Sequence, residues 1–247
     1  MNRGQLFGIL QAEHVPPVLR NILRSAYNKE TSELIINGTP TVPWPVRTGV
    51  RQGACTSPTL FNLIPEMLAR TLTNVDIGMK VGDKTVNVLM YADDIILIAN
   101  SKPDLEALVR HTEQWASFHE LTINATKTEY VVFGRNPRER LWIGERWLAP
   151  KTTTTYLGYL RRSGFTGAHA EQQALKADKA CFATIGLFRR LPHLPTDTKL
   201  TIGNACVRAT ALYGMEAMRV EKLGKLKKQL NKRLRRVARA ATGLTNA

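Results

Sequence analysis

The 247-residue sequence is poor in the features that mark several protein classes. Its three cysteines, Cys55, Cys181 and Cys206, are too widely spaced to suggest a disulfide framework or a zinc site. No apolar run approaches the roughly 20 residues that a membrane-spanning helix requires, and the first residues do not lead into a signal-peptide core. We therefore expect an intracellular protein, in the nucleus, the cytoplasm or both, with no membrane partner.

Common signatures of metal-dependent hydrolases and nucleotide-binding loops are also missing. His119 and Glu120 do not continue into an HExxH zinc motif, and His111 is a single histidine in a helical pattern, so both histidines are interpreted as structural. The sequence contains no Gly-x4-Gly-Lys phosphate loop, no internal repeat and no low-complexity segment. These absences leave the paired acidic residues and the basic charge as the informative features.

Acidic residues are scarce relative to basic ones. The chain has 35 Lys and Arg against 20 Asp and Glu, which gives a formal net charge of +15. Residues 171–247 hold 16 basic and five acidic side chains, and therefore 11 of the 15 surplus charges. Since 43% of the residues are hydrophobic, the chain can form a packed core. A folded, strongly basic protein favours a polyanionic partner such as nucleic acid.

Hydrophobic periodicity predicts strands mainly before residue 165 and helices after it. Asn37-Gly38 within a β-branched run predicts a hairpin, and Ser57-Pro58 predicts the start of a buried helix that reaches about Thr73. Ser101 and Pro103 predict the start of another helix, and breaks are expected at Pro192, Pro195 and Gly214. A domain boundary is predicted near Ser163-Gly164.

The stretch "LMYADDIIL" (residues 89–97) places two aspartates in an apolar neighbourhood. Two strands, 86–91 and 95–99, are predicted with Ala92, Asp93 and Asp94 as the hairpin loop between them. At a hairpin tip both carboxylates can project near the same spot on two buried strands. A cation would offset their charge, and Mg²⁺ prefers such oxygen ligands. The alternative is an ordinary turn, where aspartate is common.

Four segments resemble motifs of reverse transcriptases, and they occur in the family's order at plausible spacing. They are "RTGVRQGACTSPTLFNL" from residue 47, "YADD" from residue 91, "LTINATKTEYVVFG" from residue 121 and "TTYLGYL" from residue 154. Ala92, the "LTINATKTE" wording and the later "ALYGMEAM" resemble the enzymes of non-LTR (LINE-type) retrotransposons most closely. Group II intron and related bacterial enzymes share the YADD box and remain an alternative subgroup. An unrelated palm-type nucleotidyltransferase would explain the aspartates but not "RQGACTSPTLF" or "YLG".

This resemblance implies an α+β fold, with a partial right-hand polymerase palm, whose antiparallel sheet is backed by helices, followed by an α-helical thumb. Residues 1–50 would be a residual fingers and palm segment, 51–164 the palm, and 165–247 a basic thumb or linker. The implied partners are an RNA template, a DNA primer or an RNA/DNA hybrid, and a dNTP. Asp93 and Asp94 would be catalytic metal ligands for two Mg²⁺ ions, and Tyr91 would lie under the primer terminus.

The resemblance also assigns roles to two loops. Gln52 and Gly53 would contact the templating base pair, and Arg51 a template or nucleotide phosphate. Lys127 would reach the leaving phosphate and could protonate it. The alternatives are a helix-entry loop without a ligand and a solvated surface lysine. Glu120 departs from the family pattern, because many relatives have glycine there, and this change is expected to alter a turn.

Two further segments would contact nucleic acid. Tyr156, Leu157 and Gly158 would form the primer grip, although the same residues also suit an ordinary hairpin strand. Apolar residues recur every three or four positions from Lys222 to Arg239, and basic residues fill the other faces. The candidates for phosphate contact on this helix are Lys225, Lys228, Lys232, Arg235 and Arg236. A membrane-surface helix or a nuclear localisation signal is the generic alternative.

One expected carboxylate is missing. Reverse transcriptases carry a further aspartate in a motif that reads like "FD" shortly before a "V-N-R" stretch, and this chain begins "MNRGQLFGIL". The resemblance therefore suggests an N-terminally truncated domain. Asp93 and Asp94 supply only some of the carboxylate ligands that two Mg²⁺ ions need, so we expect the chain alone to be weakly active or inactive. The alternative function is an inactive retrotransposon remnant that binds nucleic acid through its basic face.

Overall fold

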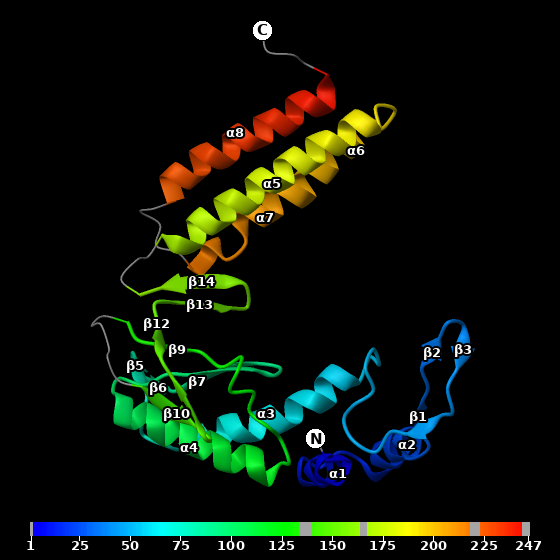
Figure 1. The fold of residues 1–247 in the computed structure, drawn as a ribbon, viewed down its shortest axis with the longest axis vertical. Helices are drawn as coiled ribbons and strands as arrows, with labels where there is room; N and C mark the ends of the chain where they lie inside the picture. Colours follow the sequence, from blue (N-terminus) through cyan, green and yellow to red (C-terminus); the bar gives the residue numbers. More distant parts are fainter. Residues whose placement is uncertain (1, 134–139, 164–166, 218–222, 244–247) are drawn as a thin grey trace. The chain divides into compact units, whose positions relative to one another are not determined.

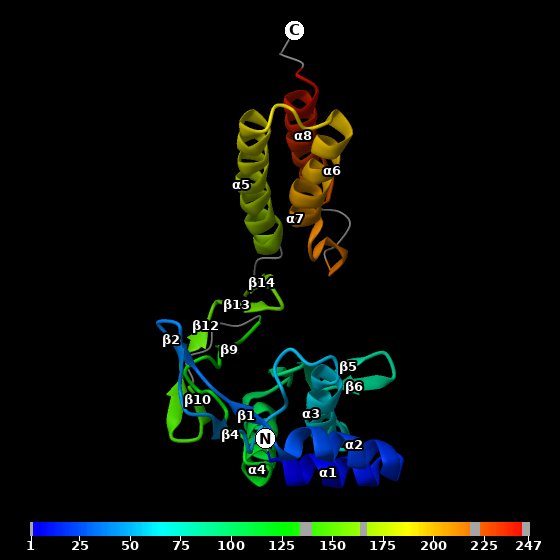
Figure 2. The ribbon, with the colours of Figure 1, turned by 90° about the vertical axis from the view of Figure 1, so that its right-hand side faces the viewer.

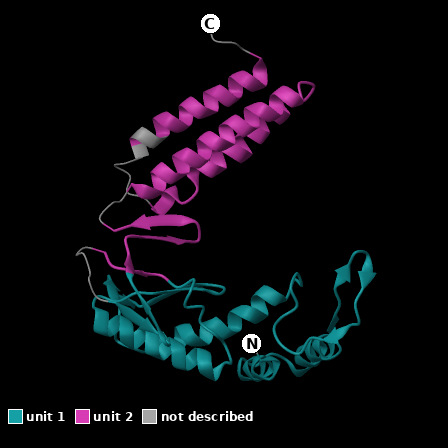
Figure 3. Ribbon diagram, in the orientation of Figure 1, with its two compact units in different colours: residues 1–128, 139–149 teal, residues 129–138, 150–247 magenta. Residues whose placement is uncertain are grey.

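The structure is a computed structural model that describes residues 2–133, 140–163, 167–217 and 223–243, without the side chains of residues 223, 225 and 226. Its internal contacts divide the chain into two compact units (Figure 3). Unit 1 comprises residues 1–128 and 139–149, and unit 2 comprises residues 129–138 and 150–247. The predicted boundary at Ser163-Gly164 adjoins residues outside the description, so the three-part division 1–50, 51–164 and 165–247 stays a prediction.

Unit 1 contains four helices and five antiparallel strand pairs among its described residues (Figure 1). The helices are α1 (Arg3–Ala12), α2 (Pro17–Asn28), α3 (Ser57–Thr73) and α4 (Lys102–Phe118). The first four strands are β1 (Thr31–Ser32), β2 (Ile35–Ile36), β3 (Thr39–Pro40) and β4 (Trp44–Pro45). They are followed by β5 (Met79–Val81), β6 (Lys84–Val86), β7 (Val88–Tyr91), β8 (Asp94–Leu97), β10 (Leu141–Ile143) and β11 (Arg146–Leu148).

The local sequence explains where these elements begin and turn. Ser101 caps α4, because its hydroxyl accepts a hydrogen bond from the Asp104 amide at 3.3 Å. Asn37 and Gly38 both have positive φ and close the β2–β3 hairpin, as Asn-Gly predicts. α3 begins at Ser57, as Ser57-Pro58 predicts, but the Ser57 hydroxyl does not cap the helix and donates to the Arg51 carbonyl.

One of the apolar cores of unit 1 lies between α3, α4 and the β7–β8 hairpin. Leu68 and Leu72 of α3 and Leu108 of α4 are fully buried. Val88, Met90 and Leu97, which share one face of the hairpin, pack against them, as do Ile77, Ala99 and Trp115. Two helices therefore back this hairpin on one side.

Unit 2 begins with short strands and continues as a helical bundle. Its strands are β9 (Tyr130–Val131), β12 (Pro150–Lys151), β13 (Thr153–Tyr156) and β14 (Tyr159–Arg162). Its helices are α5 (Ala168–Arg190), α6 (Thr196–Gly203), α7 (Ala209–Leu212) and α8 (Leu223–Thr242), with a π-helical turn η1 (Asn204–Arg208) and a 3-10 turn η2 (Met215–Ala217). α5, α8 and the α6–η1–α7 run lie side by side (Figure 2). The predicted breaks near Pro192, Pro195 and Gly214 fall between these elements.

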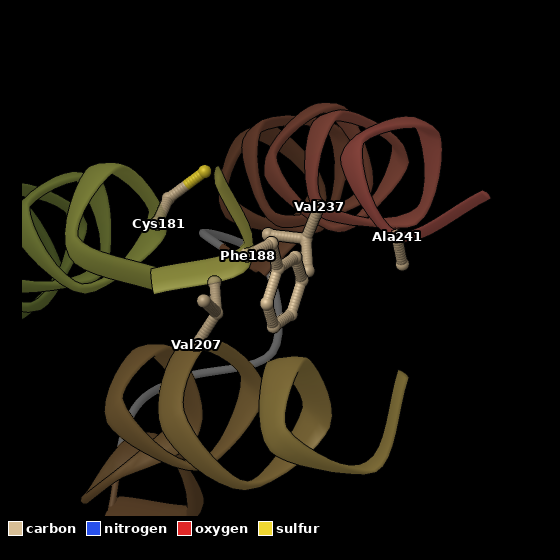
Figure 4. Close-up of a cluster of buried hydrophobic side chains, with 5 residues drawn as sticks. All are labelled: Cys181, Phe188, Val207, Val237 and Ala241. Carbon is tan, nitrogen blue, oxygen red and sulfur yellow. The ribbon is translucent and has the colours of Figure 1, made fainter. Parts of the chain in front are cut away.

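The bundle has its own apolar core. Phe188 of α5, Val207 of η1 and Val237 of α8 point toward one another, with Cys181 and Ala241 beside them (Figure 4). Burial raises the pKa of the Cys181 thiol, which favours its neutral form. This core joins elements that lie far apart in the sequence.

The α+β class is observed, but the strands do not form the single antiparallel sheet that was expected. In the described part of the chain they pair two by two, in seven separate sheets, of which β9–β12 is parallel. The expectation that the YADD strands are buried holds for one face only. Leu89 and Tyr91 on the outer face are 46% and 65% exposed, because only the opposite face packs on α3 and α4. No helix among the described residues is long and apolar enough to cross a bilayer.

Candidate active site

The YADD segment forms a two-residue hairpin. Tyr91 and Asp94 are paired across the strands, so Ala92 and Asp93 alone make the loop, and the expectation that Asp94 also lies in the loop is wrong. Ala92 can close this tighter turn because its φ is +53°, in the left-handed region. Cross-strand partners share a face, so Tyr91 and Asp94 project from the same side of the hairpin and Asp93 from its tip.

Both carboxylates are available for a ligand. Asp93 and Asp94 are exposed, and neither makes an ion pair or a side-chain hydrogen bond to another described residue. The strands behind them are fixed at their base by buried Asn87, whose amide donates to the Leu72 carbonyl at 2.6 Å. The hairpin therefore exposes two carboxylates at the end of a pair of strands whose other face is packed on α3 and α4.

Replacing Ala92 with glycine should raise the free energy of unfolding of unit 1 by about 0.5–1 kcal/mol. Left-handed φ costs a residue with a Cβ about 1–2 kcal/mol, and the greater freedom of glycine in the unfolded chain offsets part of that gain. Urea unfolding followed by tryptophan fluorescence reports on unit 1, because all four tryptophans lie in it. Ala125→Gly, at a turn residue without positive φ, should instead lower stability; an equal loss in both variants would contradict this explanation.

The loop that carries Arg51, Gln52 and Gly53 is also exposed. The Arg51 side chain is 71% exposed, and Gly53 has φ of +83° with open space around the position of a Cβ. The loop closes on itself through an Ala54 amide that donates to the Arg51 carbonyl, the same carbonyl that accepts from the Ser57 hydroxyl. The positive φ of this turn favours glycine at position 53, and the space beside its Cα is open.

A largely buried arginine that sequence reasoning did not single out, Arg3, holds the segment before this loop. Arg3 donates from Nε to the Gly49 carbonyl at 3.0 Å, from Nη1 to the Val46 carbonyl at 2.6 Å and from Nη2 to Glu30 Oε2 at 2.5 Å. It also donates to the Tyr27 carbonyl at 3.0 Å and lies over the Tyr27 ring. The only sequence signal was the Asn-Arg pair in "MNRG", which resembles the family's "V-N-R" stretch.

Lys127 lies in a tight turn after α4. The Asn124 carboxamide oxygen accepts from the Thr126 and Lys127 amides, which fixes the turn, and the Lys127 side chain is exposed. Glu120 has φ of +53°, the conformation that favours the glycine found in many relatives. The Glu120 carboxylate accepts a hydrogen bond from the side-chain amide of Asn2 at 3.1 Å, a contact that glycine at this position could not make.

In unit 2, the segment predicted as the primer grip is the turn of the β13–β14 hairpin. Tyr156 pairs with Tyr159, so Leu157 and Gly158 form a two-residue loop with φ of +46° and +77°. The Tyr213 hydroxyl donates to the Leu157 carbonyl, and a Cβ at Gly158 would lie 3.2 Å from the Tyr213 ring. The glycine is therefore required both by its φ and by the close approach of this tyrosine.

The predicted basic helix is α8. Lys228, Lys232, Arg235 and Arg236 are exposed, as the prediction requires, whereas the Lys225 side chain lies outside the description. Arg233 is different, because it is buried and donates to both oxygens of Asp178, from Nε and Nη2, at 2.7 Å each. This contact lowers the pKa of Asp178.

The predicted site residues thus divide between the two units. Arg51, Gln52, Gly53, Tyr91, Asp93, Asp94 and Lys127 belong to unit 1, and Tyr156, Leu157, Gly158 and α8 to unit 2. Within the described part of unit 1, no hydrogen bond or ion pair joins the Arg51 loop to the YADD hairpin. Each part of the site is built locally, and its residue roles stay predictions.

Comparisons with known proteins bear on the family. Residues 4–160 match the profile described as reverse transcriptase (RNA-dependent DNA polymerase). The chain is 29% identical over 145 residues to the retrovirus-related Pol polyprotein from type-2 retrotransposable element R2DM of Drosophila melanogaster, which covers 59% of this chain and 14% of that protein. It is 32% identical over 133 residues to the transposon TX1 uncharacterized 149 kDa protein of Xenopus laevis, covering 52% and 10%.

A third relative is the RNA-directed DNA polymerase from mobile element jockey of Drosophila melanogaster, with 30% identity over 126 residues, 48% of this chain and 13% of that protein. The chain therefore spans only a small part of the length of these relatives. The profile, by contrast, covers well over half of this chain and includes all four motifs. The chain belongs to the reverse transcriptase (RNA-dependent DNA polymerase) family, with relatives among the proteins of non-LTR retrotransposons, as its motifs predict.

Proposed function

We propose that this chain carries the polymerase centre of an RNA-directed DNA polymerase, with Asp93 and Asp94 as its metal ligands. The observation that supports this proposal most is the YADD hairpin itself. Its inner face packs on α3 and α4, while both carboxylates are exposed and have no partner among the described side chains. In an ordinary surface turn, nothing requires two adjacent carboxylates on so apolar a support.

The carboxylate oxygens of Asp93 and Asp94 are the type of ligand that Mg²⁺ prefers. Carboxylate oxygens are hard ligands, and Mg²⁺ usually shares one or two carboxylates with substrate phosphates. When bound, Mg²⁺ supplies positive charge that neutralises the dNTP phosphates and favours ionisation of the primer 3′-hydroxyl. Asp93 and Asp94 would hold it, and a complete domain would hold two ions.

The remaining residues would bind and orient the substrates. The reaction joins the primer O3′ to the α-phosphorus of the dNTP and breaks the bond to pyrophosphate. Arg51 would bind a phosphate, Gln52 and Gly53 would contact the templating pair, and Lys127 would donate a proton to the leaving pyrophosphate. Tyr91, on the same side of the hairpin as Asp94, would support the primer terminus.

Unit 2 would bind the primer and template. The turn at Tyr156, Leu157 and Gly158 would contact the primer near its 3′ end. The exposed cations Lys228, Lys232, Arg235 and Arg236 lie on one helix and suit backbone phosphates, which the chain's net charge of +15 also favours. In this proposal residues 51–164 act as the palm and residues 165–247 as a helical thumb.

We further propose that the 247-residue chain alone is impaired. Asp93 and Asp94 supply two of the three carboxylates that the family pattern implies, so they would hold two cations weakly. Slow synthesis is therefore expected. The second candidate function is nucleic-acid binding without catalysis, which the exposed basic residues of α8 favour.

A primer-extension assay tests these proposals. The chain, in excess over a DNA primer on an RNA template with dNTPs and Mg²⁺, should give slow template-directed extension. Asp93→Asn should reduce it about 100-fold or more. Asp83→Asn should leave it unchanged, because Asp83 occupies the matching exposed turn position of the β5–β6 hairpin.

The other outcomes separate the two candidates. Binding of the primer–template without any extension would overturn the polymerase proposal in favour of the non-catalytic one. Extension that survives Asp93→Asn would overturn the assignment of the metal ligands.

A further inference from the structure

His169 is a buried histidine to which none of the functions proposed above gives a role. It lies in the first turn of α5, and only 1% of its surface is exposed. The β13–β14 hairpin lies beside this end of α5 (Figure 1). A single histidine in a helical sequence carries no signal of its own, so this residue could be found only from its tertiary contacts.

Both ring nitrogens of His169 are used. The Leu160 amide of β14 donates to Nδ1 at 3.2 Å, so Nδ1 is the acceptor. Nε2 must then carry the proton, and it donates to the Tyr213 carbonyl at 2.8 Å. The ring also stacks on Tyr159, with centroids 4.1 Å apart and an interplanar angle of 27°. The two hydrogen bonds and the stacking therefore fix both the orientation of the ring and the position of the proton on Nε2.

The chain around this ring is shaped to fit it. Gly214 has φ of +71°, and a Cβ there would lie 2.7 Å from His169 Nε2 and 2.8 Å from the Tyr159 ring. The neighbouring Tyr213 reaches back to the hairpin, since its hydroxyl donates to the Leu157 carbonyl. The contacts thus form a closed circuit. His169 bonds to Leu160 on the hairpin, and the Leu157 carbonyl at the hairpin turn accepts from the Tyr213 hydroxyl. The Tyr213 carbonyl in turn accepts from His169.

We propose that His169 is a positioning residue for the primer, because it fixes the Leu157–Gly158 turn through both branches of this circuit. This inference rests on the proposed function, in which the turn contacts the primer. The turn itself is exposed, and Leu157 has a left-handed φ, so the position of its tip depends on these anchors. His169 touches no substrate in this scheme and acts through the hairpin.

Three substitutions at His169 separate its contacts. His169→Phe keeps an aromatic ring beside Tyr159 and removes both hydrogen bonds. His169→Asn places an oxygen near the Nδ1 position and keeps an acceptor for the Leu160 amide, whereas His169→Gln keeps a donor toward the Tyr213 carbonyl. Tyr213→Phe removes only the hydroxyl that holds the Leu157 carbonyl, and provides a second way to release the turn if the histidine variants fold poorly.

Val207→Ala is the matched control for stability. Val207 is fully buried in the core of the bundle and belongs to none of these contacts. A merely structural role for His169 predicts that Val207→Ala and His169→Phe act alike. A positioning role predicts that His169→Phe alters the environment of the primer 3′ end and that Val207→Ala does not.

The readout is a primer–template with 2-aminopurine at the primer 3′ end and a distant fluorophore for anisotropy, studied with the full 247-residue chain. Wild type should change the 2-aminopurine fluorescence on binding. His169→Phe and Tyr213→Phe should lose at least half of that change while the affinity for the duplex stays within twofold. His169→Asn and His169→Gln should be intermediate, and Val207→Ala should behave as wild type.

Hydrogen exchange of residues 157–160 distinguishes the ways in which the proposal can fail. These amides should exchange at least tenfold faster in His169→Phe than in wild type. If Tyr213→Phe alters the primer signal but His169→Phe alters neither signal, the role of His169 is overturned and the proposed function stands. If the wild-type protein binds the duplex with no 2-aminopurine response, the primer-grip assignment itself is overturned.

Discussion

Replacing Arg3 with methionine should lower the free energy of unfolding of unit 1 by about 3–5 kcal/mol. The side chains of Arg3 and Glu30 are only 12% and 13% exposed, so removing the guanidinium leaves a largely buried carboxylate whose remaining ion pair is a 3.9 Å contact with the exposed Arg51. It also leaves the carbonyls of Val46 and Gly49 without a donor. Lysine cannot restore this arrangement, because an ammonium group lacks the planar fork that reaches all of these acceptors.

The loss should be visible in urea unfolding followed by tryptophan fluorescence. Arg24→Met is the matched control, because Arg24 is an exposed arginine of the same unit that lies over the Phe7 ring, and it should cost about 0.5 kcal/mol or less. A loss within 1 kcal/mol for Arg3→Met would contradict the role of Arg3 as the anchor of the segment before the Arg51 loop.

Replacing Asp178 with asparagine should lower the stability of unit 2 by about 2–3 kcal/mol. Arg233 is buried, and its two hydrogen bonds to Asp178 would be lost or weakened while its charge stays in place. This loss is smaller than the usual cost of breaking a buried ion pair, because the Asp178 side chain is 39% exposed and water screens its charge. Hydrogen exchange of peptides from α5 and α8 measures this loss.

The contribution of Asp178 should also depend on pH. The Arg233 hydrogen bond holds the pKa of Asp178 below its usual value of 3.8, so the folded state binds the proton less tightly than the unfolded state. The difference between wild type and Asp178→Asn should therefore be constant above about pH 5 and shrink as the pH falls through the folded pKa, below 3.8.

Glu216→Gln is the control for this prediction. Glu216 is exposed, and it should cost about 0.5 kcal/mol or less at every pH. A difference for Asp178→Asn that grows as the solution is acidified would show that another group carries the effect.

Local sequence patterns predicted the positions of most elements. Periodicity and capping residues placed α3 and α4 within a few residues, and Asn37-Gly38 predicted its hairpin. The YADD hairpin was predicted, but its loop is one residue shorter than expected. Whether an alanine accepts left-handed φ depends on the strands that close around it, and no pattern in the sequence reports that.

The residues that sequence reasoning missed act over long distances. Arg3 contacts carbonyls up to 46 positions away, and His169 joins Leu160 to a carbonyl 44 positions after itself. Hydrophobic periodicity describes only neighbours within a turn or two of helix or strand, so it could not indicate either contact. The outer face of β7–β8 was misjudged for a related reason, because an apolar strand does not reveal which of its faces is covered.

Metal binding at the YADD tip is the claim on which the proposed function depends most directly. Titration with Mn²⁺, followed by paramagnetic broadening of backbone amides, locates a bound cation without requiring activity. We predict broadening centred on residues 91–95, lost in Asp93→Asn and much weaker at the Gly82–Asp83 turn, which has the same geometry with a single aspartate. Equal broadening at the two turns, or broadening at residues 91–95 that survives loss of both Asp93 and Asp94, would contradict it.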